Sequence, residues 1–394
     1  MTSLSIIILF FLVLTIVIVE SSSNHHKHRH NKLHQRAHRS NGRHRTVNKA
    51  AAKKTKDDGF VVMKLQNEQD VIFRTTLNIG SPMQTIESVF HTGCIFTRFP
   101  KAGCTSTGRF KQTVCKQNTY NPDKSKTAIK GQTYSMPESD FTYFGSSGLN
   151  YSETLRFGQT EDGQMFVIPR QSIGASTKLW KFDHAAFCAA PSYSWFKSSF
   201  REMVDQQLLS RPIMVTALKS CNKNCHSIDD GGVVTFGAYD TKNCQAQIVT
   251  WAQASLSSWK WEFKMNSFAM NGKPISIGNA ILALNTGNSY LNIPNTLMSR
   301  VINELKAEKH NGFLTVDCNS KFSFSFAFGN SLPLALDQDH LILKHQNVSG
   351  RCVLAINENK DVNHVFVLGA AFHRKYCVIH EMDKRRVVFT LNKY

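Results

Sequence analysis

Two short segments of the chain, about half its length apart, carry the same pattern of residues. The first is FHTGCIFTRFP, from Phe90 to Pro100, and the second is LNTGNSYLNIP, from Leu284 to Pro294. In each, an apolar run leads into one polar residue, His91 or Asn285. Thr-Gly follows directly, and Pro comes nine positions after the polar residue. A repeat on this scale predicts two related lobes, each of which contributes one loop to a shared cleft.

The rest of the body is typical of short strands. The stretch Val71–Gly80 alternates apolar and polar residues and ends in a Gly-Ser-Pro turn signal, and similar stretches follow along the chain. Helical spacing is found in Ser194–Leu209 and in Asn295–Glu308, the second with Asn295 as a candidate N-cap. With 394 residues, 41% of them hydrophobic, the chain can bury a large core. We therefore expect a mainly β body with a few short helices.

The N-terminus predicts entry into the secretory pathway. Residues 5–19 are fifteen uncharged, mostly apolar residues, which suits the core of a signal peptide better than a membrane span. We predict a signal peptide over residues 1–22, with a signal anchor as the alternative, and no later transmembrane span. The protein would then be secreted, or alternatively held in a lysosome or other endomembrane lumen. Asn150 and Asn347 would be its glycosylation sites.

A basic, His-rich segment follows over residues 23–59. Residues 24–56 hold eleven Lys and Arg, seven His and no Asp or Glu, so they account for more than half of the formal net charge of +19. The segment is almost free of apolar residues, which favours a solvated tail or a propeptide. Metal or haem binding by His, or adhesion to anionic glycans, are the alternatives. Nucleic acid is not an expected partner, because the body is only mildly basic and shows no binding motif.

Several motifs in order resemble the pepsin-like aspartic proteases (peptidase family A1). The segment Asn78–Gln84 is similar to the family's IGTPPQ, Gly232–Asp240 to a strand that closes the first lobe, and Val367–Tyr376 to the family's ILGDxFxRxY. The resemblance covers Phe60 to Tyr394 nearly completely. It implies an all-β, bilobal, pepsin-like acid protease fold, with an N-terminal lobe over residues 60–249 and a C-terminal lobe over residues 250–394.

The departures from the family pattern bear on catalysis. The family's two loops carry Asp-Thr-Gly, and its chemistry requires two carboxylates that share one proton around a water. By resemblance, His91 and Asn285 stand at the two aspartate positions. Asn285 can hydrogen-bond but cannot take or give a proton in the working range. We therefore predict that no intact catalytic pair exists.

Other family features divide into those kept and those lost. Thr92 and Thr286 remain, and in the family these hydroxyls bond across the lobe junction and fix the two loops. Gly93 and Gly287 also remain, consistent with tight loops. The flap that covers substrate in the family carries Tyr-Gly, whereas here Tyr143 is followed by Phe144 and Gly145. A phenyl ring cannot make the hydrogen bond of the family's tyrosine. Structural residues kept beside catalytic residues lost indicate a folded, non-catalytic protein.

The ten cysteines fit an oxidising compartment. The resemblance implies two disulfides, Cys104–Cys115 and Cys318–Cys352. Any two of Cys221, Cys225 and Cys244 could pair, and a zinc site with His226 is the alternative there. The remaining three lie in apolar strands and are expected to be buried thiols: Cys94, Cys188 and Cys377.

These observations lead to three functional hypotheses. The first is a secreted, monomeric pseudoprotease that holds a peptide or protein in the cleft, without cofactor or resident metal. The second is an endopeptidase with residual activity, in which His91, Asp183 or a nearby carboxylate replaces the lost group. The third assigns function to the His-rich tail, through metal or anionic glycans.

Overall fold

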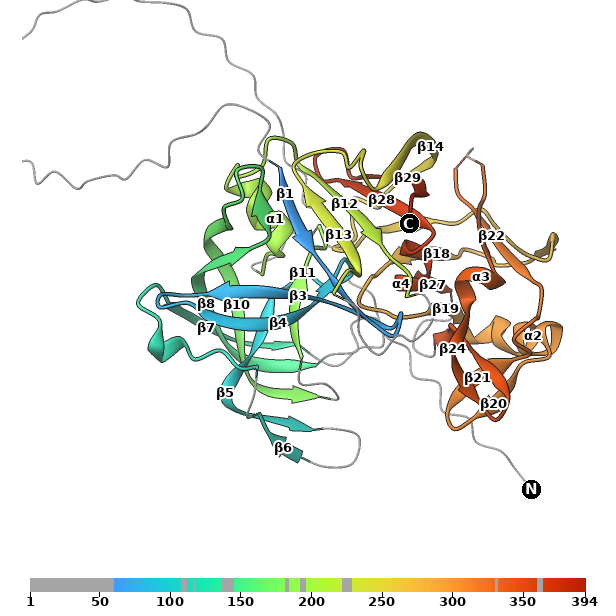
Figure 1. Cartoon of the computed structure of the whole chain (residues 1–394), viewed down its shortest axis with the longest axis horizontal. Helices are drawn as coiled ribbons and strands as arrows, with labels where there is room; N and C mark the ends of the chain where they lie inside the picture. The colour runs from blue at the N-terminus through green and yellow to red at the C-terminus, as the bar shows by residue number, and fades with distance from the viewer. Residues whose placement is uncertain are drawn as a thin grey trace, which may run out of the picture. The chain divides into compact units, whose positions relative to one another are not determined.

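The structure is a computed structural model (Figure 1), and the following account covers the residues it describes. These are residues 60–107, 112–115, 118–136, 145–180, 184–191, 196–221, 229–329, 332–359 and 364–394. The predicted signal peptide (1–22) and the basic tail (23–59) lie outside them, so those two predictions stay predictions.

The largest structural link between the two halves is a seven-stranded sheet. Its central neighbours β12 and β28 come from different halves and pair antiparallel, with Met214 opposite His380. Figure 1 shows these two strands side by side. The strand order is β14 (Cys244–Gln253), β29 (Arg386–Asn392), β28 (Tyr376–Glu381), β12 (Ile213–Leu218), β13 (Gly232–Phe236), β1 (Val61–Lys64) and β9 (Gln159–Thr160).

The first half builds a nine-stranded sheet of its own. Its order is β2 (Gln66–Glu68), β3 (Ile72–Ile79), β4 (Gln84–His91), β11 (Ala185–Cys188), β5 (Arg98–Thr107), β10 (Phe166–Trp180), β8 (Ser146–Phe157) and β7 (Ile129–Met136), with β6 (Gln112–Val114) beside β5. A single 3₁₀ turn, η1 (Pro122–Lys124), precedes β7. Strand β4 ends at His91, so this sheet sets the position of the first repeated loop.

The remaining strands of the second half form three smaller sheets. The five-stranded sheet is β15 (Glu262–Lys264), β18 (Ile281–Leu284), β27 (Val365–Leu368), β19 (Leu291–Pro294) and β26 (Ile356–Asn359). One four-stranded sheet is β17 (Lys273–Ile275), β16 (Ser267–Met270), β22 (Ser323–Ala327) and β23 (Leu334–Asp337). The other is β20 (Glu308–His310), β21 (Phe313–Val316), β25 (Arg351–Leu354) and β24 (Ile342–Val348). The second repeated loop follows β18.

Four short α-helices are found among the described residues: α1 (Ser199–Asp205), α2 (Asn295–Leu305), α3 (Gln338–Leu341) and α4 (Ala370–His373). None of the described helices has the length and apolar character needed to cross a membrane. The fold is therefore all-β and bilobal with a few short helices, as the sequence predicts. The predicted lobe boundary at residues 249 and 250 falls inside β14, a strand of the sheet that both halves share.

Both predicted helices are shorter than expected. Helix α1 starts only after Ser198, whose hydroxyl accepts the Arg201 N–H, and Gln207 ends the turn that follows with a positive φ of 55°. Helix α2 is capped by Pro294 rather than by Asn295, and it stops at Leu305 because Lys306 adopts the left-handed conformation. The spacing of apolar residues alone predicts neither the capping residue that starts a helix nor the left-handed residue that ends it.

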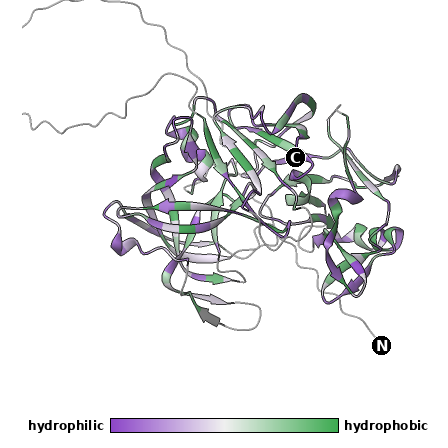
Figure 2. Ribbon diagram, in the orientation of Figure 1, coloured by the Kyte–Doolittle hydropathy of each residue, from purple (hydrophilic) through white to green (hydrophobic). Residues whose placement is uncertain are grey.

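Aromatic side chains fill the core of each half. In the first half, the ring centroids of Phe157, Phe187 and Phe236 are 5.0–6.2 Å apart. Phe268 is similarly close to Phe324 and Phe366 in the second. Figure 2 shows hydrophobic residues along the strands of the shared sheet, with hydrophilic residues toward the hairpin ends.

The two predicted glycosylation sites differ in their surroundings. Asn347 is exposed in the hairpin between β24 and β25, where its Oδ1 accepts the Gly350 N–H. Asn150 lies half-buried within β8, opposite Gly174 of β10. A methyl group on Gly131 of β7 would collide with Asn150 Oδ1, so this side chain packs closely over the neighbouring strand. Asn347 is the better placed of the two for a glycan.

A pair of buried imidazoles lies at the shared sheet. His373 of α4 and His380 of β28 are both fully buried, with ring centroids 6.5 Å apart and nearly parallel planes. The Thr216 hydroxyl is 2.9 Å from His373 Nδ1, and the Trp261 ring covers His380 at 4.9 Å. The Arg385 guanidinium lies 5.7 Å from the centroid of the Trp261 ring that covers His380. Neither imidazole forms an ion pair with a described carboxylate, because the histidine ion pairs in the described part of the chain involve His310 and His340.

Acid should therefore destabilise the fold. Burial lowers the pKa of His380 to about 3, although the Met214 and Val378 carbonyls favour the charged form. Burial and the neighbouring His380 lower the pKa of His373 as well. The unfolded chain takes up these protons near pH 6.5 and the folded chain does not, so stability falls as pH drops below about 6.5. Each histidine contributes up to about 1.4 kcal/mol per pH unit.

Urea unfolding between about pH 5 and 8 measures this slope above the range in which carboxylates titrate. The variant His373→Asn/His380→Phe should make the slope shallower by up to about 2.8 kcal/mol per pH unit, and the slope that remains comes from other histidines with a lowered pKa, such as His91. The exposed-site control His364→Gln should leave the slope unchanged. An equally steep slope in the double variant would contradict the assignment.

Candidate functional site

The two repeated loops meet across the lobe junction. His91 ends β4 and Asn285 follows β18, and the structure brings these two side chains together with His91 Nδ1 3.4 Å from Asn285 Oδ1. Asn285 Oδ1 also accepts the Gly287 N–H at 3.0 Å. His91 and Asn285 are only 2% and 4% exposed. The pair of polar positions that the repeat singles out is thus one buried contact.

The threonines next in sequence exchange hydrogen bonds. The Thr92 N–H donates to Thr286 Oγ1, and the Thr286 N–H donates to Thr92 Oγ1, both at 3.0 Å. The Thr286 hydroxyl in turn donates to the Phe90 carbonyl. The two bonds are related by the same symmetry as the repeat, and both are fully buried. These two hydrogen bonds fix the distance between the loops, and each contributes about 1 kcal/mol to the free energy of unfolding.

The loop glycines make room for the opposite side chain. A methyl group on Gly287 would collide with the imidazole of His91, and one on Gly93 would collide with the side-chain amide of Asn285. Neither glycine has a positive φ. Gly93 and Gly287 are therefore needed for close packing across the junction rather than for the tight loops that the motif suggests.

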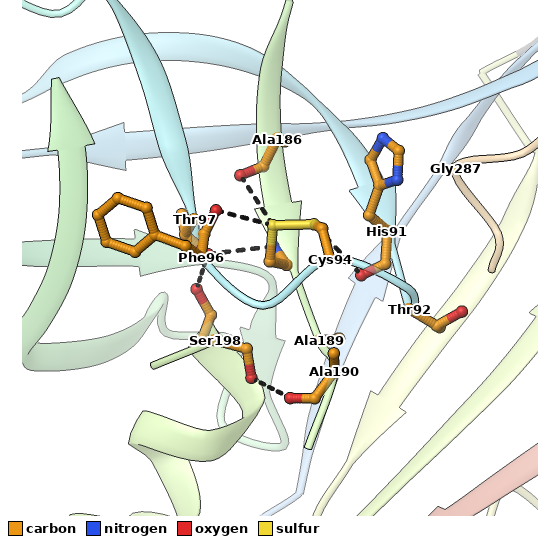
Figure 3. The surroundings of a disulfide bond; sticks show 12 residues. His91, Thr92, Cys94, Phe96, Thr97, Ala186, Ala189, Ala190, Ser198 and Gly287 are labelled. Carbon is orange, nitrogen blue, oxygen red and sulfur yellow. Dashed lines mark hydrogen bonds between the residues drawn. A yellow bond between two sulfur atoms is a disulfide. The ribbon is translucent and has the colours of Figure 1, made fainter. Parts of the chain in front are cut away.

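A disulfide ties the first loop to a neighbouring strand. Cys94, three residues after His91, is bonded to Cys188 of β11, and Cys188 stands opposite His91 in the ladder between β11 and β4 (Figure 3). The Ala189 N–H donates to the His91 carbonyl at 2.8 Å. The backbone of His91 is therefore held from both sides of its loop.

The prediction of three buried thiols is wrong. Cys94 and Cys188 are bonded to each other, and Cys377 is bonded to Cys244, which the sequence analysis had grouped with Cys221 and Cys225. All four are buried, so the apolar surroundings were recognised, but partners 94 and 133 residues away cannot be read from local sequence. Cys221 is disulfide-bonded too, which excludes it as a zinc ligand.

The two disulfides implied by the family resemblance are present. Cys104 of β5 is bonded to Cys115, which directly follows β6, and Cys318 is bonded to Cys352 of β25. Among the described residues no three His, Cys, Asp or Glu side chains gather in a way that would hold a metal ion.

Sequence reasoning missed a buried cation beside the loops. Arg98 of β5 is 3% exposed and stands opposite Ala186 of β11, two residues before Cys188. Burial and the charge of Arg98 lower the pKa of His91 to about 3, while the hydrogen bond with Asn285 opposes this shift. His91 is therefore neutral over nearly the whole pH range. The signal in the sequence was a charged residue within the apolar run CIFTRFP.

Comparison with known proteins decides the family. The family model for eukaryotic aspartyl proteases matches residues 72–391. This chain belongs to that family. It is similar to pepsin A of Suncus murinus, with 25% identity over 82% of this chain and 81% of the relative. Pregnancy-associated glycoprotein 2 of Bos taurus is 25% identical over 84% of this chain and 85% of the relative. A probable vacuolar protease A of Trichophyton verrucosum is 24% identical over 82% of this chain and 79% of the relative.

Two expected parts of this aspartyl protease site are not described by the structure. Of the predicted flap, Gly145 is described and its carbonyl accepts the Trp180 N–H at 3.0 Å, whereas Tyr143 and Phe144 lie outside the described residues. Asp183, the candidate substitute carboxylate, lies outside them as well. The roles given to these residues stay predictions.

The variant Gly287→Ala should prevent stable folding of the junction. Its methyl group would meet the His91 ring, and neither the ring nor the loop backbone can move freely in a buried site. We expect a melting temperature lower by several degrees or insoluble protein. Adding His91→Ala removes the obstacle and should restore much of the loss. If the double variant is no more stable than Gly287→Ala alone, packing against His91 is not the reason for the glycine.

The Cys94–Cys188 bond should stabilise the fold more than Cys104–Cys115. The two bonds close loops of 94 and 11 residues, and the chain-entropy model gives the longer loop an advantage of about 2 kcal/mol. Guanidinium unfolding of Cys94→Ala/Cys188→Ala and of Cys104→Ala/Cys115→Ala tests this. A larger loss in the second variant would mean that native packing, rather than chain entropy, sets the order.

Proposed function

We propose that this aspartyl protease family member is a secreted pseudoprotease that binds a peptide or protein without cutting it. One observation carries the proposal: the side chains that meet at the centre of the junction are His91 and Asn285, at 3.4 Å. The family resemblance assigns these positions to the two catalytic aspartates. Peptide hydrolysis by such a pair needs one carboxylate to take the proton of a water and a second to give a proton to the substrate carbonyl.

Neither residue can fill either role. His91, with its pKa lowered to about 3, is a weak base near neutral pH, and burial beside Arg98 opposes the charged imidazolium it would become. Asn285 has no proton to give in this range. Its Oδ1 accepts the Gly287 N–H and lies within hydrogen-bonding distance of His91 Nδ1. The contact is a structural hydrogen bond rather than a proton-sharing pair.

The surrounding framework supports a binding role. The threonine exchange, the two glycines and the Cys94–Cys188 bond all hold the loops in place, although the chemistry they would serve is absent. A peptide in the cleft that the family resemblance implies would add main-chain hydrogen bonds as an extra strand does. Because His91 and Asn285 are nearly covered, the ligand would be recognised by the walls around them. Disulfides formed by all the described cysteines favour secretion, as does the apolar leader.

The purified full chain should not cleave denatured protein substrates between about pH 3 and 7, with or without pepstatin. Mass spectrometry of a peptide library after incubation checks this, with pepsin A as the positive control. Size-exclusion chromatography of the same mixture should recover intact peptides bound to the protein. Cleavage that disappears in His91→Ala would contradict the pseudoprotease assignment. If no peptide co-elutes with the protein, the proposed peptide binding is contradicted.

A further inference from the structure

A groove runs beside the edge of the shared sheet, away from the His91 and Asn285 loops. Strand β14 is the last strand of that sheet on this side, and the groove separates it from β15 and from Phe328, Gly329 and Leu332. Its volume is about 610 Å³, within the range of about 300–1,000 Å³ found for ligand sites. Its lining includes Ile248, Trp251, Lys264, Phe328 and Leu332.

The edge of β14 that borders the groove has no partner strand among the described residues. β14 pairs with β29 alone, and all six residues from 248 to 253 line the groove. An unpaired edge presents a row of backbone N–H and C=O groups to any extended chain that reaches it. Proteins usually block such edges with charged residues or proline, but Cys244–Gln253 contains neither. The ladder with β29 shifts register between Cys244 and Thr250, so the regular part of the edge that is open to strand addition is Thr250–Gln253.

Apolar side chains are exposed along the same groove. Leu332 is 70% exposed, Ile248 57% and Trp251 51%. Trp251 is held in place by the Arg386 guanidinium, 5.7 Å from its ring centroid, and Arg386 itself is ion-paired with Glu381. The groove thus combines a hydrogen-bonding edge with a fixed aromatic wall.

Lys264 supplies the only charge among the residues that line the groove. No described carboxylate forms an ion pair with it, in contrast to the paired Arg386. A carboxylate on a bound peptide could form an ion pair with Lys264. Insertion into a bilayer is a poor alternative, because an unpaired strand edge is costly in hydrocarbon.

We propose that the groove beside β14 binds an extended apolar peptide that adds to β14 as an antiparallel or parallel strand and places one carboxylate against Lys264. The peptide would bury Trp251, Ile248 and Leu332. This site is separate from the cleft of the proposed function and does not depend on it.

The probes are the fluorescein-labelled peptide TVTVTE-amide, its TVTVTK counterpart, and TVTVTE-amide with alternate backbone nitrogens methylated. Fluorescence polarisation with the full chain should give a Kd for the acidic probe about tenfold below that of the lysine probe. Lys264→Glu should reverse this preference. Lys309→Glu, which changes an exposed lysine on β20, should leave it unchanged. The methylated probe should bind about tenfold more weakly, because it lacks donors for the edge of β14.

Unlabelled TVTVTE-amide should also change the tryptophan fluorescence of the full chain, and Trp251→Phe should abolish that change while leaving the fold intact. No binding by either probe at about 1 mM, or equal binding that ignores Lys264→Glu, would overturn the proposal. A concentration-dependent dimer in analytical ultracentrifugation would also overturn the proposal if Lys264→Glu or Trp251→Ser abolished that dimer. The occupant of the groove would then be a second copy of the chain. Binding of phosphatidylserine vesicles through Trp251 would overturn it in favour of a lipid surface.

Discussion

The reciprocal hydrogen bonds between Thr92 and Thr286 are the constraint on which the centre of this protein depends. Each threonine uses its backbone N–H as donor and its hydroxyl as acceptor, so neither loop can shift without breaking both bonds in a site that water does not reach. The contact between His91 and Asn285, and the packing of each over the opposite glycine, follow from the spacing that these bonds set. These threonine bonds need no charge on the residues that stand before them, His91 and Asn285.

Loops held by these bonds do not require carboxylates at the positions of His91 and Asn285. Carboxylates at the two positions would place like charges close together, which costs stability unless they share a proton. A neutral imidazole against an amide carries no such cost, and the neighbouring Arg98 would keep the imidazole neutral. A buried cation is compatible with His91 and Asn285, but it would bind an aspartate strongly and disturb proton sharing.

The sequence predicted the architecture well because the repeat and the strand pattern are local signals repeated many times. It also placed His91, Thr92, Asn285 and Thr286 in one site, since two copies of a motif in related lobes must face each other. It failed where a property depends on distant partners. Cys94, Cys188 and Cys377 sit in apolar strands, and burial alone does not distinguish a thiol from half of a disulfide. The role of Arg98 was missed for the same reason, because its neighbours come from β10 and β11.

The shared sheet has a consequence for how the chain is made. β12 can pair with β13 as soon as the first half has been synthesised, but its other edge waits for β28, where Thr216 meets Val378 across 162 residues of sequence. At about 5–20 residues per second, that edge is open for roughly 8 to 30 seconds on every nascent chain. The first half of the molecule emerges with an exposed apolar strand, and the last twenty residues complete it. Truncation near the C-terminus would therefore leave unsatisfied surface in the half of the protein that was finished first.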